Sequence, residues 1–274
     1  MTAKKVIYLD YNIFESYRVN DVEGLRAVVD GLKDDHVLPY SPAHMEDLAS
    51  SLAWRDFEED EIKVVLERCQ ERLQNVIDIS KMVEVFPGKE HQPTQIVVEH
   101  PGACLVRVLE HFARNRFLDV RERLLLERIK ATDTKGERSS KISNLPVDFL
   151  SATEYALQIQ SKLEASRELM NNKKEAGLED FKWPSISKSH AVLEHVFEIL
   201  MNYLEEVRFR PEEVKKSRSR MHDVTHAIYA TKADIFVTGD DRFYHKIKVA
   251  YHYLNVPTKI LSLEEFIKQG DSSL

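Results

Sequence analysis

Short apolar runs near the two ends of the chain limit its fold more than any other feature of the sequence. One run is Val6-Ile7-Tyr8-Leu9 and another is Ile235-Phe236-Val237. Strands that are apolar at consecutive positions suit a parallel sheet, because both of its faces are covered. We therefore expect the two ends of the chain to pack together as parts of one α/β sheet.

Helical stretches alternate with further apolar runs at both ends of the sequence. Such alternation of strands and helices is typical of βαβ units. The expected elements are a helix around Val22 to Leu32, a strand at His36 to Leu38, a helix from Pro42, a helix through Met221 to Lys232, a helix from Asp241 and a strand at Lys259 to Leu261.

The middle of the chain differs in composition and is dominated by Glu, Lys, Arg and Leu. Apolar residues recur there at i, i+3, i+4 and i+7, which predicts amphipathic helices. Two such stripes run from Ile62 to Val76 and from Leu193 to Val207. The predicted fold is α/β, a parallel sheet flanked by helices that is formed by residues 1–53 and 211–274 and interrupted by a large all-helical insertion at 54–210.

Charge, cysteine content and hydropathy indicate the cellular location of the protein more than they indicate its function. The 274 residues carry a formal net charge of -7, so the chain lacks the overall basic field of many nucleic-acid-binding proteins. Cys69 and Cys104 form no CxxC pair, and no apolar stretch approaches the roughly 20 residues that span a bilayer. The apolar run after the N-terminal lysines is too short for a signal peptide. We expect a cytoplasmic protein that does not enter a membrane.

Two aspartates lie just after predicted strands. Asp10 comes after Leu9, and Asp240 follows the strand that begins at Ile235. The carboxyl ends of parallel strands meet at one edge of a sheet, where ligands bind, so the two carboxylates could share a metal ion. The alternative role of each is to cap the helix that follows. At the second strand we assign the cap to Asp241 and leave Asp240 for the site.

Asp223 is predicted to join these acids from a helix. Ala227 and Ala230 lie on the same face of that helix, and such a small-residue face can approach the sheet closely. A carboxylate at the margin of a packing face is unfavourable unless it is paired or bound to a metal. The alternative is partial exposure with Arg220 as its partner.

Glu46 is the fourth predicted acid. It lies one turn into a helix that is expected to begin at Pro42, a residue suited to the first turn. This position places it within reach of the sheet edge. Asp47 is the alternative, although a helix turns the neighbouring side chain about a quarter-turn away.

Four segments, in this order, resemble the PIN domains, a family best known from the toxin ribonucleases of bacterial toxin–antitoxin pairs. An Asp in a helix, followed by a strand, T-x-D-x-x-F and another helix, is the usual ending of that family. The resemblance implies a PIN-like sheet domain with nuclease activity and leaves the helical middle of the chain unexplained. The segments are Leu9-Asp10-Tyr11-Asn12, Ser41 to Leu48 with its terminal Glu-x-Leu, Asp223-Val224-Thr225-His226-Ala227 and Thr238-Gly239-Asp240-Asp241-Arg242-Phe243.

Phosphodiester hydrolysis explains why four acids would be needed. The reaction requires charge neutralisation at the phosphate and hydroxide near neutral pH, and divalent metals provide both. Mg²⁺ and Mn²⁺ prefer carboxylate oxygens and water as ligands. We assign Asp10 as the central ligand. Asp223 and Asp240 are expected to complete its shell, and Glu46 to bind a second metal or orient water.

Other residues are expected to surround the four acids. The resemblance implies that Asn12 and Thr238 support the metal ligands. A basic face leading to the site could follow a phosphate backbone, and a solvated helix surface is the alternative. The candidate nucleic-acid contacts are Lys215, Lys216, Arg218, Arg220, Arg242 and Lys246.

His222 and His226 flank Asp223 at i, i+4 spacing, which can bind zinc or manganese on a helix. The sequence lacks HExxH and indicates no third ligand. Packing or hydrogen bonding is therefore the favoured role of both imidazoles.

Taken together, the residues predict a metal-dependent endonuclease with Mg²⁺ or Mn²⁺, in the first place a ribonuclease that acts as a toxin or defence effector. An RNA substrate, an inhibitory protein partner and a homo-oligomer are the expected partners. A DNA-directed nuclease and a catalytically silent PIN-like scaffold are the alternatives. An aspartate-nucleophile phosphatase is disfavoured, because Asn12 stands where that family has its second acid.

Overall fold

A parallel sheet joins the two ends of the chain in the structure, a computed structural model that describes residues 4–50, 59–89, 91–114, 142–211 and 217–270. The strands β1 (Ile7–Leu9), β4 (Ile235–Thr238) and β5 (Lys259–Ser262) lie in the order β1-β4-β5. Leu9 pairs with Val237, so the beginning and the end of the sequence meet directly. The prediction of one α/β sheet from both chain ends is confirmed.

Backbone pairing continues on the other side of β1. Val37 bridges Val6 in parallel, and Tyr40 bridges Glu84 of the strand β2 (Val83–Phe86), which pairs antiparallel with β3 (Gln95–Val98). The prediction that residues 54–210 are all-helical is therefore wrong at this hairpin. Its strands flank a Pro- and Gly-containing segment, and their apolar residues were too few to stand out as strands in a chain region rich in helical patterns.

The sheet separates two hydrophobic cores, since side chains alternate between its faces. Tyr8 and Phe236 point into one core, whereas Ile7, Leu9 and Val237 point into the other. The second core is formed with α1 (Tyr11–Val19), α2 (Leu25–Leu32), α3 (Pro42–Ser50), α4 (Glu59–Ser80), α5 (Pro101–Arg114) and α13 (Leu263–Gly270).

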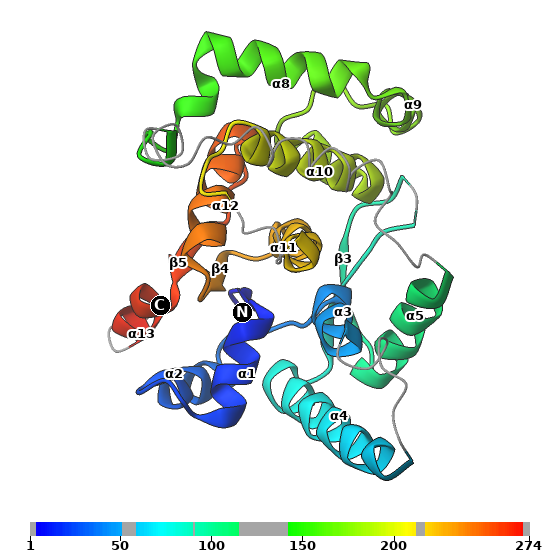
Figure 1. Cartoon of the computed structure of the whole chain (residues 1–274), viewed down its shortest axis with the longest axis vertical. Helices are drawn as coiled ribbons and strands as arrows, with labels where there is room; N and C mark the ends of the chain where they lie inside the picture. The colour runs from blue at the N-terminus through cyan, green and yellow to red at the C-terminus, as the bar shows by residue number, and fades with distance from the viewer. Residues whose placement is uncertain (1–3, 51–58, 90, 115–141, 212–216, 271–274) are drawn as a thin grey trace.

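The first core extends into a layer of helices from the middle of the chain. α10 (His190–Glu206) packs against α11 (Ser217–Ala230) and α12 (Asp241–Leu254), and α8 (Thr153–Ala165) and α9 (Arg167–Glu175) cover α10 (Figure 1). The rings of Phe197 on α10 and Tyr251 on α12 lie 5.7 Å apart between centroids. The helical middle of the chain therefore builds part of the same core as the sheet.

The amphipathic spacing correctly predicted the two long helices of the middle region. Their apolar stripes differ in how far they are buried. On α10 the predicted stripe is buried, including Leu193, Val196 and Leu200. On α4 the stripe is buried at Val76, whereas Leu66 is 61% exposed. Periodicity thus predicted both helices, but the part of α4 that is covered depends on its neighbours.

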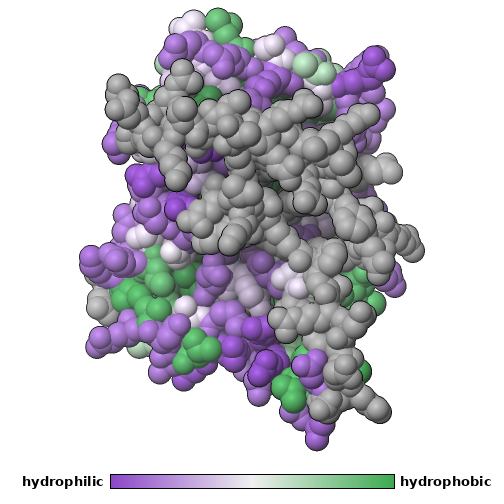
Figure 2. All heavy atoms as spheres, viewed as in Figure 1, coloured by the Kyte–Doolittle hydropathy of each residue, from purple (hydrophilic) through white to green (hydrophobic). Residues whose placement is uncertain are grey.

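On the face shown in Figure 2, the residues that are not drawn in grey are mainly hydrophilic, and the hydrophobic ones among them form separate small patches. Among the helices of the described ranges, none combines the length and apolar character required to cross a bilayer.

Candidate active site

Asp10 lies at the carboxyl end of β1, beside the end of β4. Its N–H donates to the carbonyl of Val237 at 2.9 Å, and the hydroxyl of Thr238 donates to Asp10 Oδ2 at 2.8 Å. Asp10 occupies the N-cap position of α1, yet its carboxylate accepts this bond across the sheet. The side chain is buried, with 4% of its surface exposed. The parallel pairing of the two strands therefore places Thr238 against Asp10, as the support role predicted for Thr238 requires.

Asp240 is linked to Asp10 through the same hydroxyl. The Asp240 N–H donates to Thr238 Oγ1 at 3.2 Å, and Asp240 Oδ1 accepts from the N–H of Phe243 at 2.9 Å. Asp240 therefore caps α12, and the assignment of the cap to Asp241 is wrong. The chain bends so that Asp241 is already the first helical residue, and its exposed carboxylate pairs with Arg210 instead.

A buried histidine connects two of the carboxylates from other elements. His226 Nε2 lies 2.9 Å from Asp47 Oδ2 and 3.6 Å from Asp10 Oδ1. Asp223, half-buried and one turn before His226 on α11, acts on the same imidazole through its charge. Residues from β1, α3 and α11 thus surround one side chain, which the sequence favoured for hydrogen bonding rather than ligation.

Glu46 and Asp47 take different places on α3. The hydroxyl of Thr225 donates to Glu46 Oε2 at 3.1 Å, whereas Asp47 meets His226 beside Asp10. Asp47 lies three residues after His44, a buried residue of α3 that faces β1, so helical spacing turns Asp47 to the same side. The sequence favoured Glu46 because it could not determine how α3 is rotated against the sheet.

A chain of hydrogen bonds continues from His226 into the protein. Tyr8 Oη lies 2.8 Å from His226 Nδ1 and 2.6 Å from Ser41 Oγ. The Ser41 N–H donates to His44 Nδ1 at 3.1 Å, which leaves His44 Nε2–H to donate to the Leu9 carbonyl at 2.8 Å. Burial, and the positive charge of His226, hold the pKa of His44 well below its usual value, in agreement with this neutral tautomer.

Burial and charge act in opposite directions on the two central groups. Burial raises the pKa of Asp10, and this exceeds the lowering by His226 and by the Thr238 hydrogen bond. Burial by itself lowers the pKa of His226, but Asp10, Asp47 and Asp223 raise it above the ordinary value of histidine. The fold therefore holds Asp10 in a place where its negative charge is only partly compensated.

Asp10→Asn should stabilise the metal-free protein at neutral pH. An acid whose folded-state pKa is raised loses its contribution to stability as the pH rises from its ordinary range through the folded-state value. Asparagine keeps the shape and stays neutral. We expect a higher Tm for Asp10→Asn in EDTA, by about 2–4 °C for each kcal/mol gained.

Asp241→Asn is the matched control, because its carboxylate is 73% exposed and should contribute less than about 0.5 kcal/mol. If Asp10→Asn has a lower Tm than the unaltered protein, the Asp10 carboxylate instead stabilises the metal-free fold.

Two other predicted site residues lie in the first helical turns that follow Asp10 and Asp240. Asn12 is exposed in the first turn of α1, and Arg242 is half-buried in the first turn of α12. Lys215 and Lys216 lie outside the described residues, as do the side chains of Arg218, Arg220 and His222, whose backbone belongs to α11.

Lys246 is not available to nucleic acid, and its prediction as a contact is wrong. It is 2% exposed and lies 2.5 Å from Glu205 of α10. The helical layer covers this face of α12, so a lysine that seemed to belong to a basic surface is part of a buried ion pair.

A second carboxylate cluster, which the sequence did not indicate, lies at the β2–β3 hairpin. Ligand atoms of Glu84, Glu99 and Cys104 come within 4.8 Å of one another, and this group could hold a metal ion. Among the described residues it is this group, rather than Asp10 with its neighbours, that brings three such atoms so close. Arg107 Nη2 lies 2.7 Å from Glu84 and Nη1 lies 2.6 Å from Glu99, so one guanidinium already pairs with both carboxylates.

Glu84 should make stability fall with rising pH. Burial and a hydrogen bond with Glu99 raise the pKa of Glu84 to about 7, against the lowering by Arg107. The contribution of Glu84 to folding is complete below pH 4.5 and is lost as the pH rises to about 7 and slightly above.

We expect Glu84→Gln to flatten the dependence of the unfolding free energy on pH between about 5 and 8, measured by urea unfolding. Glu110→Gln, at an exposed position of α5, should leave that dependence unchanged. A slope as steep in Glu84→Gln as in the unaltered chain would assign the pH dependence to other groups.

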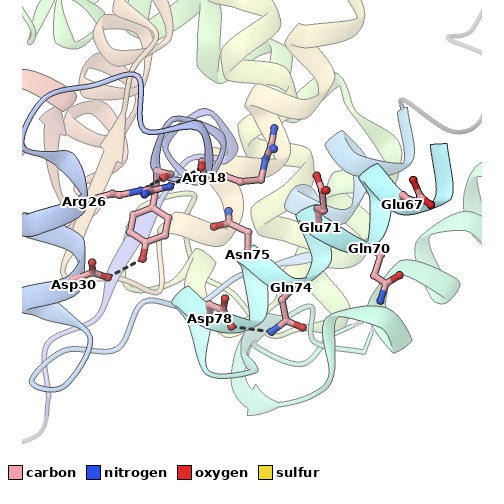
Figure 3. A pocket seen from close by; sticks show the side chains of 10 residues that line it. Arg18, Arg26, Asp30, Glu67, Gln70, Glu71, Gln74, Asn75 and Asp78 are labelled. Atoms are coloured by element: carbon pink, nitrogen blue, oxygen red, sulfur yellow. Dashed lines mark hydrogen bonds between the residues drawn. The ribbon is translucent and has the colours of Figure 1, made fainter. Parts of the chain in front are cut away.

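A groove of about 810 Å³ lies between the α1–α2 pair and α4, away from the predicted acids (Figure 3). Arg18 and Arg26 line one side, and Glu67, Glu71 and Asp78 of α4 line the other. Arg26 is already engaged, since it donates to the carbonyls of Tyr17 and Arg18 at the end of α1. None of the predicted site residues belongs to the described lining of this groove.

Comparison of the chain with protein-family models, with curated proteins and with solved structures gives no match.

Proposed function

We propose that this chain is a metal-dependent endoribonuclease with a PIN-like domain. Asp10, Asp223 and Asp240, with one acid of α3, are the proposed ligands of Mg²⁺ or Mn²⁺. The observation that carries the proposal is the bridge from the Asp10 carboxylate through the Thr238 hydroxyl to the backbone N–H of Asp240, which links two acidic residues at the ends of neighbouring parallel strands. The order of acids along the sequence, on which the resemblance to the PIN family depends, supports it.

The donor set suits a hard divalent cation. The proposed ligands are carboxylates, which Mg²⁺ and Mn²⁺ prefer, and the pKa of buried Asp10 is raised as expected for a charge that the protein only partly compensates. A bound divalent ion would supply the missing positive charge, neutralise phosphate oxygens and lower the pKa of coordinated water.

The residues of the chain prepare two carboxylates for this role. Thr238 holds Asp10 Oδ2, and Asp10 Oδ1 faces His226. The capping bond from Phe243 fixes Asp240 Oδ1, so the orientation of this carboxylate is determined by the start of α12. Ligands held in this way by hydrogen bonds lose little freedom when a metal binds.

The purified protein should cleave RNA in the presence of Mg²⁺ or Mn²⁺ and stop in EDTA. Asp10→Asn and Asp240→Asn should each reduce cleavage by more than about 100-fold, because loss of outer partners of a metal site alone costs about 10–100-fold. Initial rates on single-stranded and structured RNA and on DNA, at saturating Mn²⁺, measure this.

Asp241→Asn separates catalysis from the loss of a negative charge at the start of α12, since it alters the exposed neighbour of Asp240 and should keep its rate. Full activity of both Asp10→Asn and Asp240→Asn would exclude the proposed site. Cleavage of DNA alone would replace the ribonuclease by a DNA-directed nuclease. Failure to cleave any substrate of the panel would favour a scaffold role.

We further propose that such a ribonuclease acts as a toxin or defence effector restrained by a protein partner or a trigger. Induced expression in bacterial cells should then slow growth, whereas Asp10→Asn at equal protein level should not, because only the former degrades RNA. Growth curves with immunoblots of both proteins test this. Equal growth of both strains would remove the basis of the toxin role.

A further inference from the structure

We propose that His226 is a positioning residue that holds Asp47 beside Asp10, so that Asp47, rather than Glu46, is the α3 carboxylate of the metal site. This inference rests on the proposed function and deepens it. It assigns a role to a histidine that follows Asp223 by three residues on α11.

The contacts of His226 are those of a fixed bridge between elements. Its side chain is 2% exposed, and Nε2 lies 2.9 Å from Asp47 Oδ2 and 3.6 Å from Asp10 Oδ1. An N–H that points at two carboxylates attracts both of them, and it brings α3 and β1 together at the end of the strand. Asp47 is thereby held at the same imidazole as Asp10.

Tyr8 prevents the imidazole from turning. Its hydroxyl lies 2.8 Å from His226 Nδ1, and it is itself 2.6 Å from Ser41 Oγ in a fully buried environment. The rings of Tyr8 and His226 also meet edge to face with centroids 5.8 Å apart. With Nδ1 engaged on the inside, Nε2 must face the carboxylates, as outer partners of metal sites commonly orient the groups they contact.

Hydrogen bonding separates the two acids of α3. Asp47 Oδ2 lies 2.9 Å from His226 Nε2, the imidazole nitrogen that also faces Asp10. Glu46 Oε2 instead accepts from the Thr225 hydroxyl at 3.1 Å. Asp47 therefore shares its partner with Asp10, whereas Glu46 is held by a different side chain of α11.

Loss of the imidazole would leave like charges facing each other. Asp10 and Asp47 would lose the donor between them, and Asp223 adds a third negative charge near the same place. Repulsion should then move Asp47 away from the site in the metal-free protein, and metal binding would have to bring it back. The expected result is weaker metal binding without a change in the surface that contacts RNA.

The experiment measures Mn²⁺ affinity by calorimetry, and kcat and KM for RNA as Mn²⁺ is varied, for full-length variants. His226→Ala should weaken Mn²⁺ binding by about 10–100-fold. Its kcat at low Mn²⁺ should fall and recover at high Mn²⁺, with KM for RNA unchanged. His226→Gln, whose amide N–H can replace Nε2–H, should restore most of the affinity.

Further variants keep the inference testable if His226→Ala does not fold. Tyr8→Phe, which removes the hydroxyl that orients the ring, should weaken Mn²⁺ binding less than His226→Ala but in the same direction. Asp47→Asn should weaken Mn²⁺ binding more than Glu46→Gln does. Asp47→Asn combined with Tyr8→Phe should bind Mn²⁺ no more weakly than Asp47→Asn alone, because both changes act through the contact of His226 with Asp47.

The outcomes distinguish this inference from the function on which it rests. Unchanged Mn²⁺ affinity in His226→Ala and Asp47→Asn, with Asp10→Asn inactive, would overturn the positioning role and leave the nuclease intact. A larger loss in Glu46→Gln than in Asp47→Asn would also overturn it. Retention of Mn²⁺ binding and cleavage by Asp10→Asn would instead overturn the proposed function and the positioning role with it.

Discussion

The parallel pairing of β1 with β4 is the contact on which the rest of the structure depends. It aligns Leu9 with Val237, so Asp10, directly after β1, and Thr238, the last residue of β4, meet at one edge of the sheet. The hydrophobic effect drives this pairing, since both strands are fully buried between two cores. Chemistry-bearing side chains from the two ends of the sequence are thus brought together by the burial of apolar ones.

Burial also explains the electrostatics of this edge. A carboxylate in the interior is unfavourable unless charge or hydrogen bonds compensate it, and Asp10 has both partners, Thr238 and His226, without full compensation. The network through Tyr8, Ser41 and His44 satisfies the polar groups beneath the acids. A polar interior of this kind is stable only when its members are paired, which fixes their orientation.

The helical layer and the β2–β3 hairpin, both from the middle of the chain, pack against elements from its two ends. α10 shares a hydrophobic core with α11 and α12, and a buried ion pair between Glu205 and Lys246 fastens the layer to α12. The hairpin of β2 and β3 meets the backbone of Tyr40, so part of the middle of the chain extends the sheet. The cluster of Glu84 with Arg107 then ties the hairpin to α5.

Sequence alone determined the strands β1 and β4, the helices α4 and α10 and the strand-end acids, because buried strands and amphipathic helices have a characteristic local pattern of apolar residues. Apolar runs located β1 and β4, and Asp10 and Asp240 follow from their position after those runs. Tertiary structure alone decided that Asp47 and not Glu46 reaches His226 and that Lys246 is buried. These outcomes depend on how each helix is rotated and covered, which is set by packing between residues distant in sequence, so no local pattern could determine them.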